Sequence, residues 1–513
     1  MLRNLLCLCL SLFPLLSFAQ WHQASGPDGD FAVSESGPTH WSVALDQNIK
    51  WKLTLLETGQ SMPIVVGCKV FFSTLKPVEE DSTLEKDIIA WCCEAETGKV
   101  LWKREILGKY PLRMSGCFGD SSAPAPVCDG ESVIFLNASG AMTSFDLAGN
   151  KLWSKQYLSV GRTMPFLHQG KYIYTRQVYP PDPNGSFPHK YKDSPKDMWT
   201  QLQALDVKTG EIVWTSECGV NMGMTTMPQT RKDGLEVAIV GRGGGHGPPE
   251  KPHGISMVNL ENGKTLWTLP LDGFMATQSY RLYNGAVHIF HKGDHLSVDE
   301  NTGKILKTVS IIKDIPTWRK MDGKRVLQNE TLFIGKNRMI TQGSNLLVGN
   351  YHYFRSYVRP WVGRVDVETG KVEYLELPLQ ISRKPDQLDE LIWYKEPSGG
   401  KKAPGLTKQG VPNDMMNSRG LKVVGDKRSH GSGWGHIASP QMTVAGNHLY
   451  MPVMNGTVFV LGLNARQLDE SAIVAINDLG PAGQSFTRAS VSFSAGRAYA
   501  HTIRELICIA DEL

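Results

Sequence analysis

The chain alternates short apolar runs with short polar junctions. The runs span about five to seven residues, as in Asn447 to Val453 and Thr457 to Leu461, which is too short for most helices. The junctions are rich in glycine, aspartate and asparagine, as in Ala445-Gly446-Asn447, and such residues favour tight turns. The pattern therefore predicts an all-β chain of short antiparallel strands joined by hairpins.

One turn motif recurs along most of the chain. Its clearest copies are Glu96 to Trp102, Lys208 to Trp214 and Glu261 to Trp267, each with Gly at its third position and Trp at its seventh. Weaker copies lie at residues 148–153, 301–307 and 368–374. Glycine suits the positive φ of a tight hairpin, and the Trp begins a strand with a large apolar face. A repeat of this kind indicates stacked copies of one small unit.

Each unit contains four strands, because two short apolar strands precede the strand that enters the turn. Four antiparallel strands per repeat, ordered from inner to outer, are typical of a β-propeller blade. The sequence predicts eight blades, near residues 61–106, 121–158, 161–218, 224–271, 274–311, 331–378, 436–480 and 484–513.

The last unit lacks an outer strand, because the chain stops shortly after the strand Leu506 to Ala510. An unmatched outer-strand pattern, Asn48 to Leu55, lies near the other terminus and contains Trp51. We expect these two segments to pair, which would close the ring and remove two exposed sheet edges.

The sequence resembles the PQQ-like (pyrroloquinoline quinone) β-propeller repeat proteins in three features. These are the Thr-Gly-Lys-x-x-Trp turns, the expected ring closure, and a Ser/Thr-x-Pro start of several blades, at residues 61–63, 122–124, 163–165 and 226–228. That family includes the assembly factor BamB and the quinoprotein alcohol dehydrogenases, whose repeat Trp packs on the neighbouring blade. The resemblance gives this structural role to Trp51, Trp102, Trp153, Trp214 and Trp267. Tyr374 is then a candidate substitute, and Lys307 departs from the pattern.

Residues 1–19 have the form of a signal peptide, with Arg3, an apolar run and Ser17-Phe18-Ala19 before the cleavage site. We therefore expect an exported protein, periplasmic or secreted, with an N-terminal extension at residues 20–47 and the propeller at 48–513. No later segment has the length and apolarity of a transmembrane helix. The formal net charge is +4, but the chain contains no cluster of consecutive basic residues, which argues against nucleic acid as a partner.

The long insertions all fall on one face of the predicted propeller. Loops between the second and third strands of a blade emerge on the same face as the connections between blades, whereas the glycine turns lie on the opposite face. The insertions at residues 76–87, 178–198, 242–254 and 350–361 are of the first kind, and those at 107–120, 312–330 and 379–435 are of the second. A binding site is expected among these loops.

Aromatic, basic and histidine side chains of these loops are the candidate ligand-binding residues. They are His246, His253, Tyr351, His352, Arg355, Trp361, Arg428, His430, Trp434 and His436. Scattered surface histidine is the alternative interpretation, because no metal-ligand spacing is present and no metal site is predicted. Since no catalytic set assembles, we expect a non-enzymatic binding or scaffold module whose partner is an envelope protein or polysaccharide.

The alternative from family resemblance is an oxidoreductase that uses PQQ and calcium on an alcohol or sugar. Such a site needs a carboxylate and an amide as calcium ligands, an Asp that acts as the general base, and an aromatic side chain on which the quinone ring stacks. The loops offer Asp120, Asn413, Asp414 and Glu330, with Trp361 or Trp434 as a platform, but no motif joins them. The adjacent Cys92 and Cys93 lie in a predicted strand, so we expect buried apolar residues rather than the vicinal disulfide of those enzymes.

Overall fold

The computed structural model describes most of the chain from residue 20 to residue 511. The residues outside the description are 1–19, 117, 157–163, 179, 186–194, 222–225, 244–250, 322–323, 335–339, 342, 357–358, 378–380, 385–386, 394–410, 431–433, 435–439 and 512–513. The proposed leader therefore lies outside the described residues.

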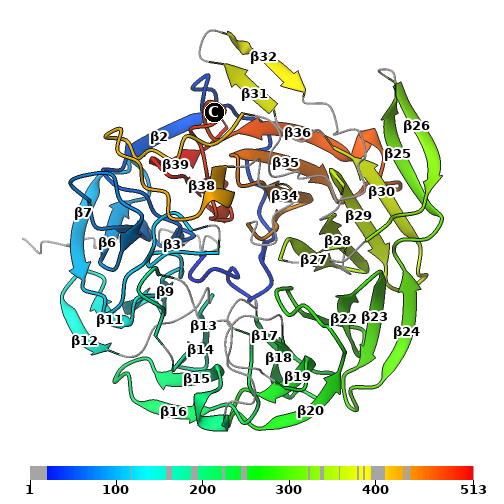
Figure 1. The fold of residues 1–513 in the computed structure, drawn as a ribbon, viewed down its shortest axis with the longest axis horizontal. Helices are drawn as coiled ribbons and strands as arrows, with labels where there is room; N and C mark the ends of the chain where they lie inside the picture. The colour runs from blue at the N-terminus through cyan, green and yellow to red at the C-terminus, as the bar shows by residue number, and fades with distance from the viewer. Residues whose placement is uncertain are drawn as a thin grey trace, which may run out of the picture.

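The described strands form eight blade sheets around a central axis, which confirms the predicted all-β propeller (Figure 1). Blade 1 consists of β3 (Ile64–Val66), β4 (Lys69–Leu75), β6 (Ile88–Glu94) and β7 (Val100–Ile106), and blade 2 of β9 (Val127–Cys128), β10 (Ser132–Asn137), β11 (Ala141–Asp146) and β12 (Lys151–Gln156). Blade 3 consists of β13 (Phe166–His168), β14 (Lys171–Arg176), β15 (Gln201–Asp206) and β16 (Ile212–Thr215), and blade 4 of β17 (Pro228–Thr230), β18 (Glu236–Arg242), β19 (Gly254–Asn259) and β20 (Thr265–Pro270).

The second half of the ring has the same four-stranded plan. Blade 5 consists of β21 (Arg281–Tyr283), β22 (Ala286–His291), β23 (Asp294–Asp299) and β24 (Ile305–Ser310), and blade 6 of β27 (Asn345–Val348), β28 (Tyr351–Arg355), β29 (Trp361–Asp366) and β30 (Val372–Glu376). Blade 7 consists of β33 (Thr443–Ala445), β34 (His448–Pro452), β35 (Thr457–Gly462) and β36 (Ile473–Asp478), and blade 8 of β37 (Ser492–Ser494), β38 (Arg497–His501), β39 (Glu505–Ile509) and β2 (Ile49–Thr54). Each blade lies within its predicted span.

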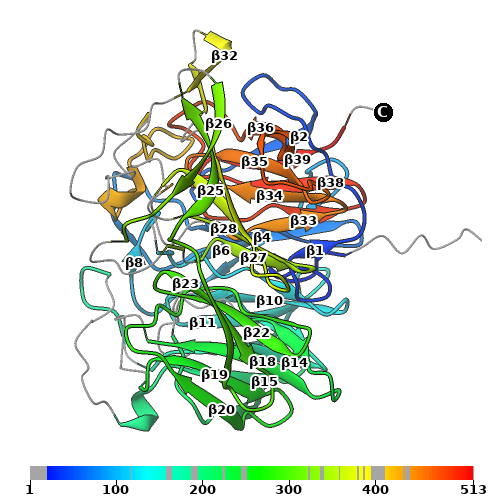
Figure 2. The same cartoon turned by 90° about the vertical axis from the view of Figure 1, so that its right-hand side faces the viewer.

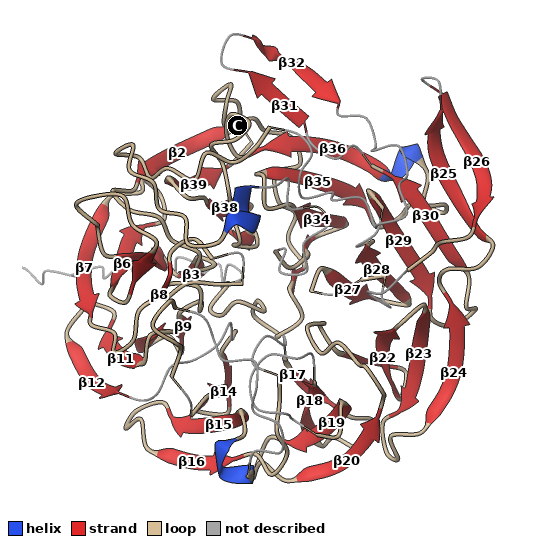
Figure 3. Cartoon of the chain, viewed as in Figure 1, coloured by secondary structure: helices blue, strands red, loops and turns tan. Residues whose placement is uncertain are grey.

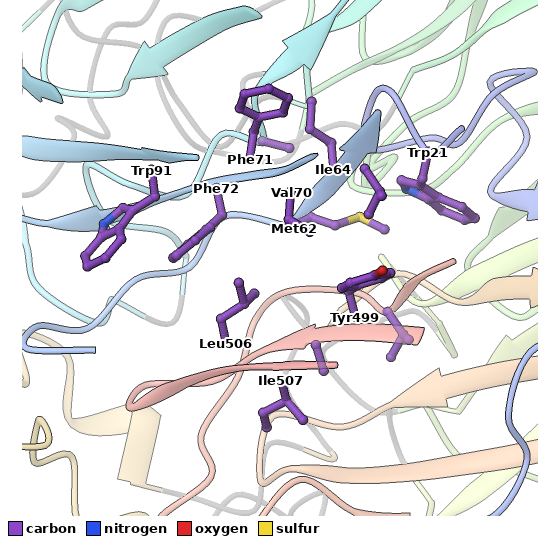
Figure 4. Close-up of a cluster of buried hydrophobic side chains, with 14 of the residues drawn as sticks. Trp21, Met62, Ile64, Val70, Phe71, Phe72, Trp91, Tyr499, Leu506 and Ile507 are labelled. Atoms are coloured by element: carbon purple, nitrogen blue, oxygen red, sulfur yellow. The ribbon is translucent and has the colours of Figure 1, made fainter. Parts of the chain in front are cut away.

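The ring closes as predicted, because β2 is the outer strand of blade 8. It pairs antiparallel with β39, with Leu53 opposite Leu506 and Trp51 opposite Cys508. Around this closure, side chains of blades 1 and 8 pack into one apolar core that also includes Trp21 (Figure 4).

The repeat tryptophans join five of the blades, blade 8 and blades 1 to 4, to the blade that follows. In blades 1 to 5, the pairing of the third and fourth strands has a register shift. Because of this shift, the residue at the repeat Trp position, four residues after the turn glycine, points toward the following blade. The indole N–H donates to a carbonyl there: Trp51 to Ala95 at 3.1 Å, Trp102 to Leu147 at 3.3 Å, Trp153 to Val207 at 2.9 Å, Trp214 to Leu260 at 3.1 Å and Trp267 to Glu300 at 2.9 Å.

Blades 5 and 6 depart from this pattern. Lys307 occupies the Trp position of blade 5, and its ammonium donates to the Glu368 carbonyl at 2.8 Å. Tyr374 does not substitute for Trp in blade 6, so that expectation is wrong. The pairing of β29 with β30 has no register shift, so Tyr374 faces the opposite way and its hydroxyl donates to the Ile311 carbonyl. Arg364 contacts blade 7 instead, donating to the Ala465 and Arg466 carbonyls.

Residues 312–330 are not the simple connecting loop that we expected. They form a hairpin of β25 (Ile315–Met321) and β26 (Lys324–Glu330). β25 adds to blade 6 in parallel with β30, which makes a six-stranded sheet with β26 at its edge. Polar and apolar residues do not alternate regularly in this segment, so the sequence carries little signal for these two strands.

The N-terminal segment from Trp21 to Val33 runs around the inner ends of several blades. The Trp21 carbonyl accepts from Val65 in blade 1, the His22 carbonyl accepts from Cys128 in blade 2, and Asp30 lies 3.9 Å from Arg281 in blade 5. β1 (Ala32–Val33) then adds in parallel to the inner strand of blade 7. Because these inner strands end at the glycine turns, the segment lies across the turn-face end of the central channel (Figure 2).

The remaining elements are short. They are the strand pair β5 (Leu84–Glu85) and β8 (Leu112–Arg113), the hairpin β31 (Ile381–Lys384) and β32 (Gln387–Trp393), and the 3-10 turns η1 (Lys196–Met198), η4 (Lys427–His430) and η5 (Glu470–Ala472). Within the described part of the chain, no helix is long and apolar enough to span a lipid bilayer.

Candidate binding site on the long-loop face

The described part of the long connection between blades 6 and 7 includes residues 411–430, which lie on blades 8 and 1. This segment packs on blades 1 and 8 rather than on its sequence neighbours (Figure 3). Asn417 donates to Glu57 at 3.1 Å, Arg504 pairs with Asp414 at 2.6 Å, and the Gly425 amide donates to Met114. We call this segment the crossing segment; it covers part of the long-loop face.

An open cleft of about 570 Å³ lies where the crossing segment meets blade 1. Its walls come from β5, β8, the loop at Asn184, and the start of η4. The lining residues are Thr83, Leu84, Arg113, Asn184, Gly425, Asp426, Lys427 and Arg428. This volume is within the range of ligand-binding sites, so the cleft is the main candidate on this face.

The cleft carries uncompensated positive charge. Arg428 is paired with Asp426 at 2.6 Å, and its guanidinium lies 4.2 Å from the centre of the Phe118 ring, which holds it in place. Arg113 donates to the backbone and side-chain oxygens of Asn184, and Lys427 is exposed. Within the described residues, neither Arg113 nor Lys427 forms an ion pair with a carboxylate, so the cleft favours an anionic ligand.

Polar residues also fill the channel beneath the crossing segment. Asp120 is fully buried and accepts from the Ser115 amide at 3.1 Å and from the Ser122 hydroxyl at 2.6 Å. Burial raises the pKa of this carboxyl to about 6, although those hydrogen bonds and the charge of Arg488 lower it. Ser429 of the crossing segment donates to the Ser115 carbonyl, which joins this network to the cleft wall.

Little space is left in this part of the channel. The void beside Gln60, Met62 and Arg488 has a volume of about 30 Å³, and Ala24 of the N-terminal segment forms part of its wall. A void of this size holds about one water molecule, whereas small-molecule sites occupy several hundred Å³.

The residues considered for a calcium and quinone site are not all in one place, although Asn413 donates to the Ser429 carbonyl and so joins the network of Ser115 and Asp120. Asp414 pairs with Arg504, while Glu330 pairs with Arg319 at the outer edge of blade 6. Trp361 is buried beside Tyr374 within blade 6, and Trp434 lies beneath Arg355. No cluster of three or more His, Cys, Asp or Glu side chains with metal-binding geometry occurs among the described residues.

Three of the predicted ligand residues belong to the framework of blade 6. Residues 351–355 form β28 and are not a loop, which corrects the expectation for this segment. His352 and Trp361 are fully buried, and Tyr351 is half-buried with the Arg364 guanidinium 4.4 Å from its ring centre. They pack between blades and do not present a ligand surface.

The other predicted residues lie in separate places on the long-loop face. Arg355 donates to the Trp434 carbonyl and lies over its indole ring, and both side chains are buried. His253 is half-buried in blade 4 beside Gly243. Of the predicted residues that the structure describes, only Arg428 lines the cleft; His430 is nearby and its ring contacts the Asn413 carbonyl at 2.8 Å. His246 and His436 lie outside the described residues.

A buried histidine network between blades 5 and 6 was not predicted from the sequence. His295 Nε2 lies 3.1 Å from His352 Nδ1, and His352 Nε2 lies 3.1 Å from the side-chain oxygen of Asn345. His288 stacks on His295 with 5.5 Å between the ring centres. Burial lowers the pKa of all three rings, to about 4 for His288. The three residues lie on different strands, so only the fold brings them together.

Cys92 and Cys93 are separate buried thiols in β6, as expected for apolar residues of a strand. Burial raises the pKa of each thiol to about 12, so both are protonated at neutral pH.

Comparison with known proteins agrees with the repeat pattern. Residues 59–216, which hold blades 1 to 3, match the family model described as the outer membrane protein assembly factor BamB. The fold is similar to that of the quinohemoprotein alcohol dehydrogenase ADHIIG from Pseudomonas putida HK5, with a TM-score of 0.52 and 14% identity over 96% of this chain and 80% of that chain. The resemblance to the PQQ-like β-propeller proteins is confirmed. A search of curated proteins gave no match to this chain.

Two other solved structures with a similar fold have a lower sequence identity to this chain. A europium-containing methanol dehydrogenase has a TM-score of 0.54 and 10% identity, over 94% of this chain and 89% of that chain. BamB from Moraxella catarrhalis has a TM-score of 0.47 and 10% identity, over 91% of this chain and 98% of that chain. At such identities the likeness of the PQQ-like propellers concerns the fold, and the function has to be argued from the site.

Proposed function

We propose that this protein is an exported, non-enzymatic binding or scaffold module that holds an acidic partner in the cell envelope through its long-loop face. The observation that carries the proposal is the open cleft whose Arg113 and Lys427 have no carboxylate partner among the described residues. The partner class is an envelope protein or a polysaccharide. Export is supported by the signal-like form of residues 1–19.

The segments that cover the two ends of the channel also support the long-loop face as the partner-binding face. The N-terminal segment lies across the turn-face end and buries Trp21, Ala24 and Phe31 completely. The crossing segment covers part of the other end and supplies Lys427 and Arg428 to the cleft. A partner would therefore bind the long-loop face at the cleft, without entering the channel.

Binding to defined acidic probes tests this proposal. The mature protein is titrated with a fluorescent poly-glutamate peptide and, separately, with labelled polygalacturonate, at low and at physiological salt. The variant Arg113→Glu/Lys427→Glu is expected to bind at least about tenfold more weakly, because two favourable charges become repulsive. A protein partner predicts preference for the peptide, and a polysaccharide partner predicts preference for the polymer.

The matched control reverses two exposed lysines of the glycine-turn face, Lys208→Glu/Lys264→Glu. This control changes the net charge equally, so it should leave binding nearly unchanged if the cleft is the site. Equal loss in both variants would contradict the proposal, because only a non-specific effect of net charge would remain. A characteristic absorbance spectrum and a raised Tm after addition of PQQ and calcium would favour the oxidoreductase instead.

A further inference from the structure

The outer edge of blade 6 ends in an exposed strand, β26. The sheet order begins at β26 and continues to β25 and β30, so no described strand pairs with its outer edge. Exposed strand edges present free backbone donors and acceptors, and proteins usually shorten, charge or cover them. Here the hairpin projects from the rim of the ring, beyond the outer strands of the neighbouring blades (Figure 1).

Large apolar side chains gather along this hairpin. The exposed fractions are 46% for Met321, 40% for Val326, 51% for Leu327 and 85% for Phe333. They lie close together in the chain, whereas the exposed apolar residues of the other blades occur singly or in pairs. Concentration of apolar surface on an unpaired edge is typical of an interaction site.

The sequence of β26 is complementary to itself when two copies run antiparallel. With Leu327 opposite Leu327 of the copy, Lys324 lies opposite Glu330, and Arg325 lies opposite Asn329. The pairing therefore places Lys324 of each copy beside the Arg319–Glu330 ion pair of the other, with an apolar contact at the centre of the strand. The same two-fold centre brings the Met321 end of one hairpin toward the Phe333 end of the other.

We propose that this protein forms a two-fold symmetric dimer in which β26 of one copy pairs antiparallel with β26 of the other. The two blade 6 sheets then form one continuous sheet across the dimer. Parallel addition of β25 to β30 shows that this blade already accepts a strand on its outer side. An isologous contact uses the same surface twice, as self-complementarity requires.

The interface would be small, because one strand of each copy carries it. Contacts of this size belong to the weak end of specific interfaces, so a dissociation constant of about 1 to 100 μM is expected. Each blade keeps its own core, and the cleft lies near blade 1, so the dimer is independent of the proposed ligand site. Failure of one proposal leaves the other intact.

Sedimentation velocity of the mature protein across about 1 to 200 μM tests the dimer. The wild-type sedimentation coefficient is expected to rise with concentration, and Leu327→Asp should weaken association at least about tenfold by opposing two buried carboxylates. The matched control is Leu152→Asp on the outer strand of blade 2, because Leu152 is 53% exposed. This control should dimerise like the wild type, and the Tm of each variant shows that it is folded.

Charge reversal at the strand ends gives a second, more specific test. Lys324→Glu places Glu opposite Glu330 and should weaken the dimer, while Lys324→Arg keeps the opposite charges and the Arg319–Glu330 pair and should leave the affinity nearly unchanged. A wild-type protein that stays monomeric at 200 μM would overturn the proposal. A dimer that is insensitive to Leu327→Asp would overturn it as well, because another surface would then hold the copies together.

Discussion

The indole N–H of Trp51 donates to the carbonyl of Ala95 at 3.1 Å, and this contact joins the N-terminal strand of blade 8 to blade 1. The same indole lies against the turn glycine Gly98, so one side chain connects the closure of the ring with the repeat motif. The chain therefore closes its ring by the same contact that joins blades 1 to 4 to the blades that follow them.

Trp51→Ala should destabilise the protein, because it removes a large apolar contact and a hydrogen bond at the closure. The expected loss is about 2 to 4 kcal/mol in the free energy of unfolding, toward the lower end because Trp51 is only half-buried. Urea unfolding followed by tryptophan fluorescence and circular dichroism measures it. Trp51→Phe should lose less, since it keeps an aromatic ring; an equal loss would point to the hydrogen bond as the main contribution.

Gly98→Ala should cost more than Gly67→Ala. Both glycines have positive φ, 73° and 57°, so both variants suffer backbone strain of about 1 kcal/mol or more. A Cβ atom on Gly98 would lie 2.7 Å from the Trp51 ring, whereas a Cβ atom on Gly67 has nothing within 4 Å. The difference in unfolding free energy isolates the contact between blades, and no difference would show that the ring moves aside freely.

Stability should fall as the pH is lowered from about 6.5 to about 4. Burial lowers the pKa of His288 and of His501 from 6.5 to about 4, so in this window the unfolded chain binds protons that the folded protein does not. Each ring then removes up to about 3 kcal/mol between neutral pH and pH 4. Asp120 opposes this trend below pH 6, since its raised pKa makes the folded state bind a proton first.

Chemical denaturation at pH 7.5 and pH 5 measures this dependence. His501→Gln should make the loss of stability between the two pH values smaller, because the residue that takes up the proton in the unfolded chain is gone. An unchanged or steeper dependence in that variant would contradict the assignment to His501.

Phe31→Ala should loosen the N-terminal segment without unfolding blade 7. The Val444 amide donates to the Phe31 carbonyl at 2.8 Å, and the Gly446 amide donates to the Val33 carbonyl at 3.0 Å. Both amides should exchange faster with deuterium in this variant. The Val453 amide bonds within blade 7 to Thr457, and it should keep its wild-type rate. Faster exchange of all three amides would instead indicate loosening of the whole blade.

The repeat made most of the fold predictable from the sequence. The Gly-x-x-x-Trp spacing located the blade turns, and the unmatched Trp51 strand located the closure, because both depend on local strand and turn chemistry. Tyr374 was misassigned because its spacing matches, while its orientation depends on a register shift that β29 and β30 lack. The hairpin of β25 and β26 was missed because its pairing with β30 is not local.

The candidate site was much less predictable. Arg428 lies in the predicted loop set, but Arg113 and Lys427 meet it only because the crossing segment packs on blade 1. His352 and Trp361 carry suitable chemistry, yet burial between blades removes them from any ligand surface. Loop residues far apart in the chain have no periodicity that links them, so their grouping needs the structure.

Hydrogen–deuterium exchange of the mature protein, with and without a saturating acidic probe, tests the central claim most directly. We expect protection at residues 83–84, 113 and 425–428, which line the cleft, and no change around Trp21 to Val33 on the turn face. Protection confined to the turn face, or to the channel around Gln60 and Arg488, would contradict it.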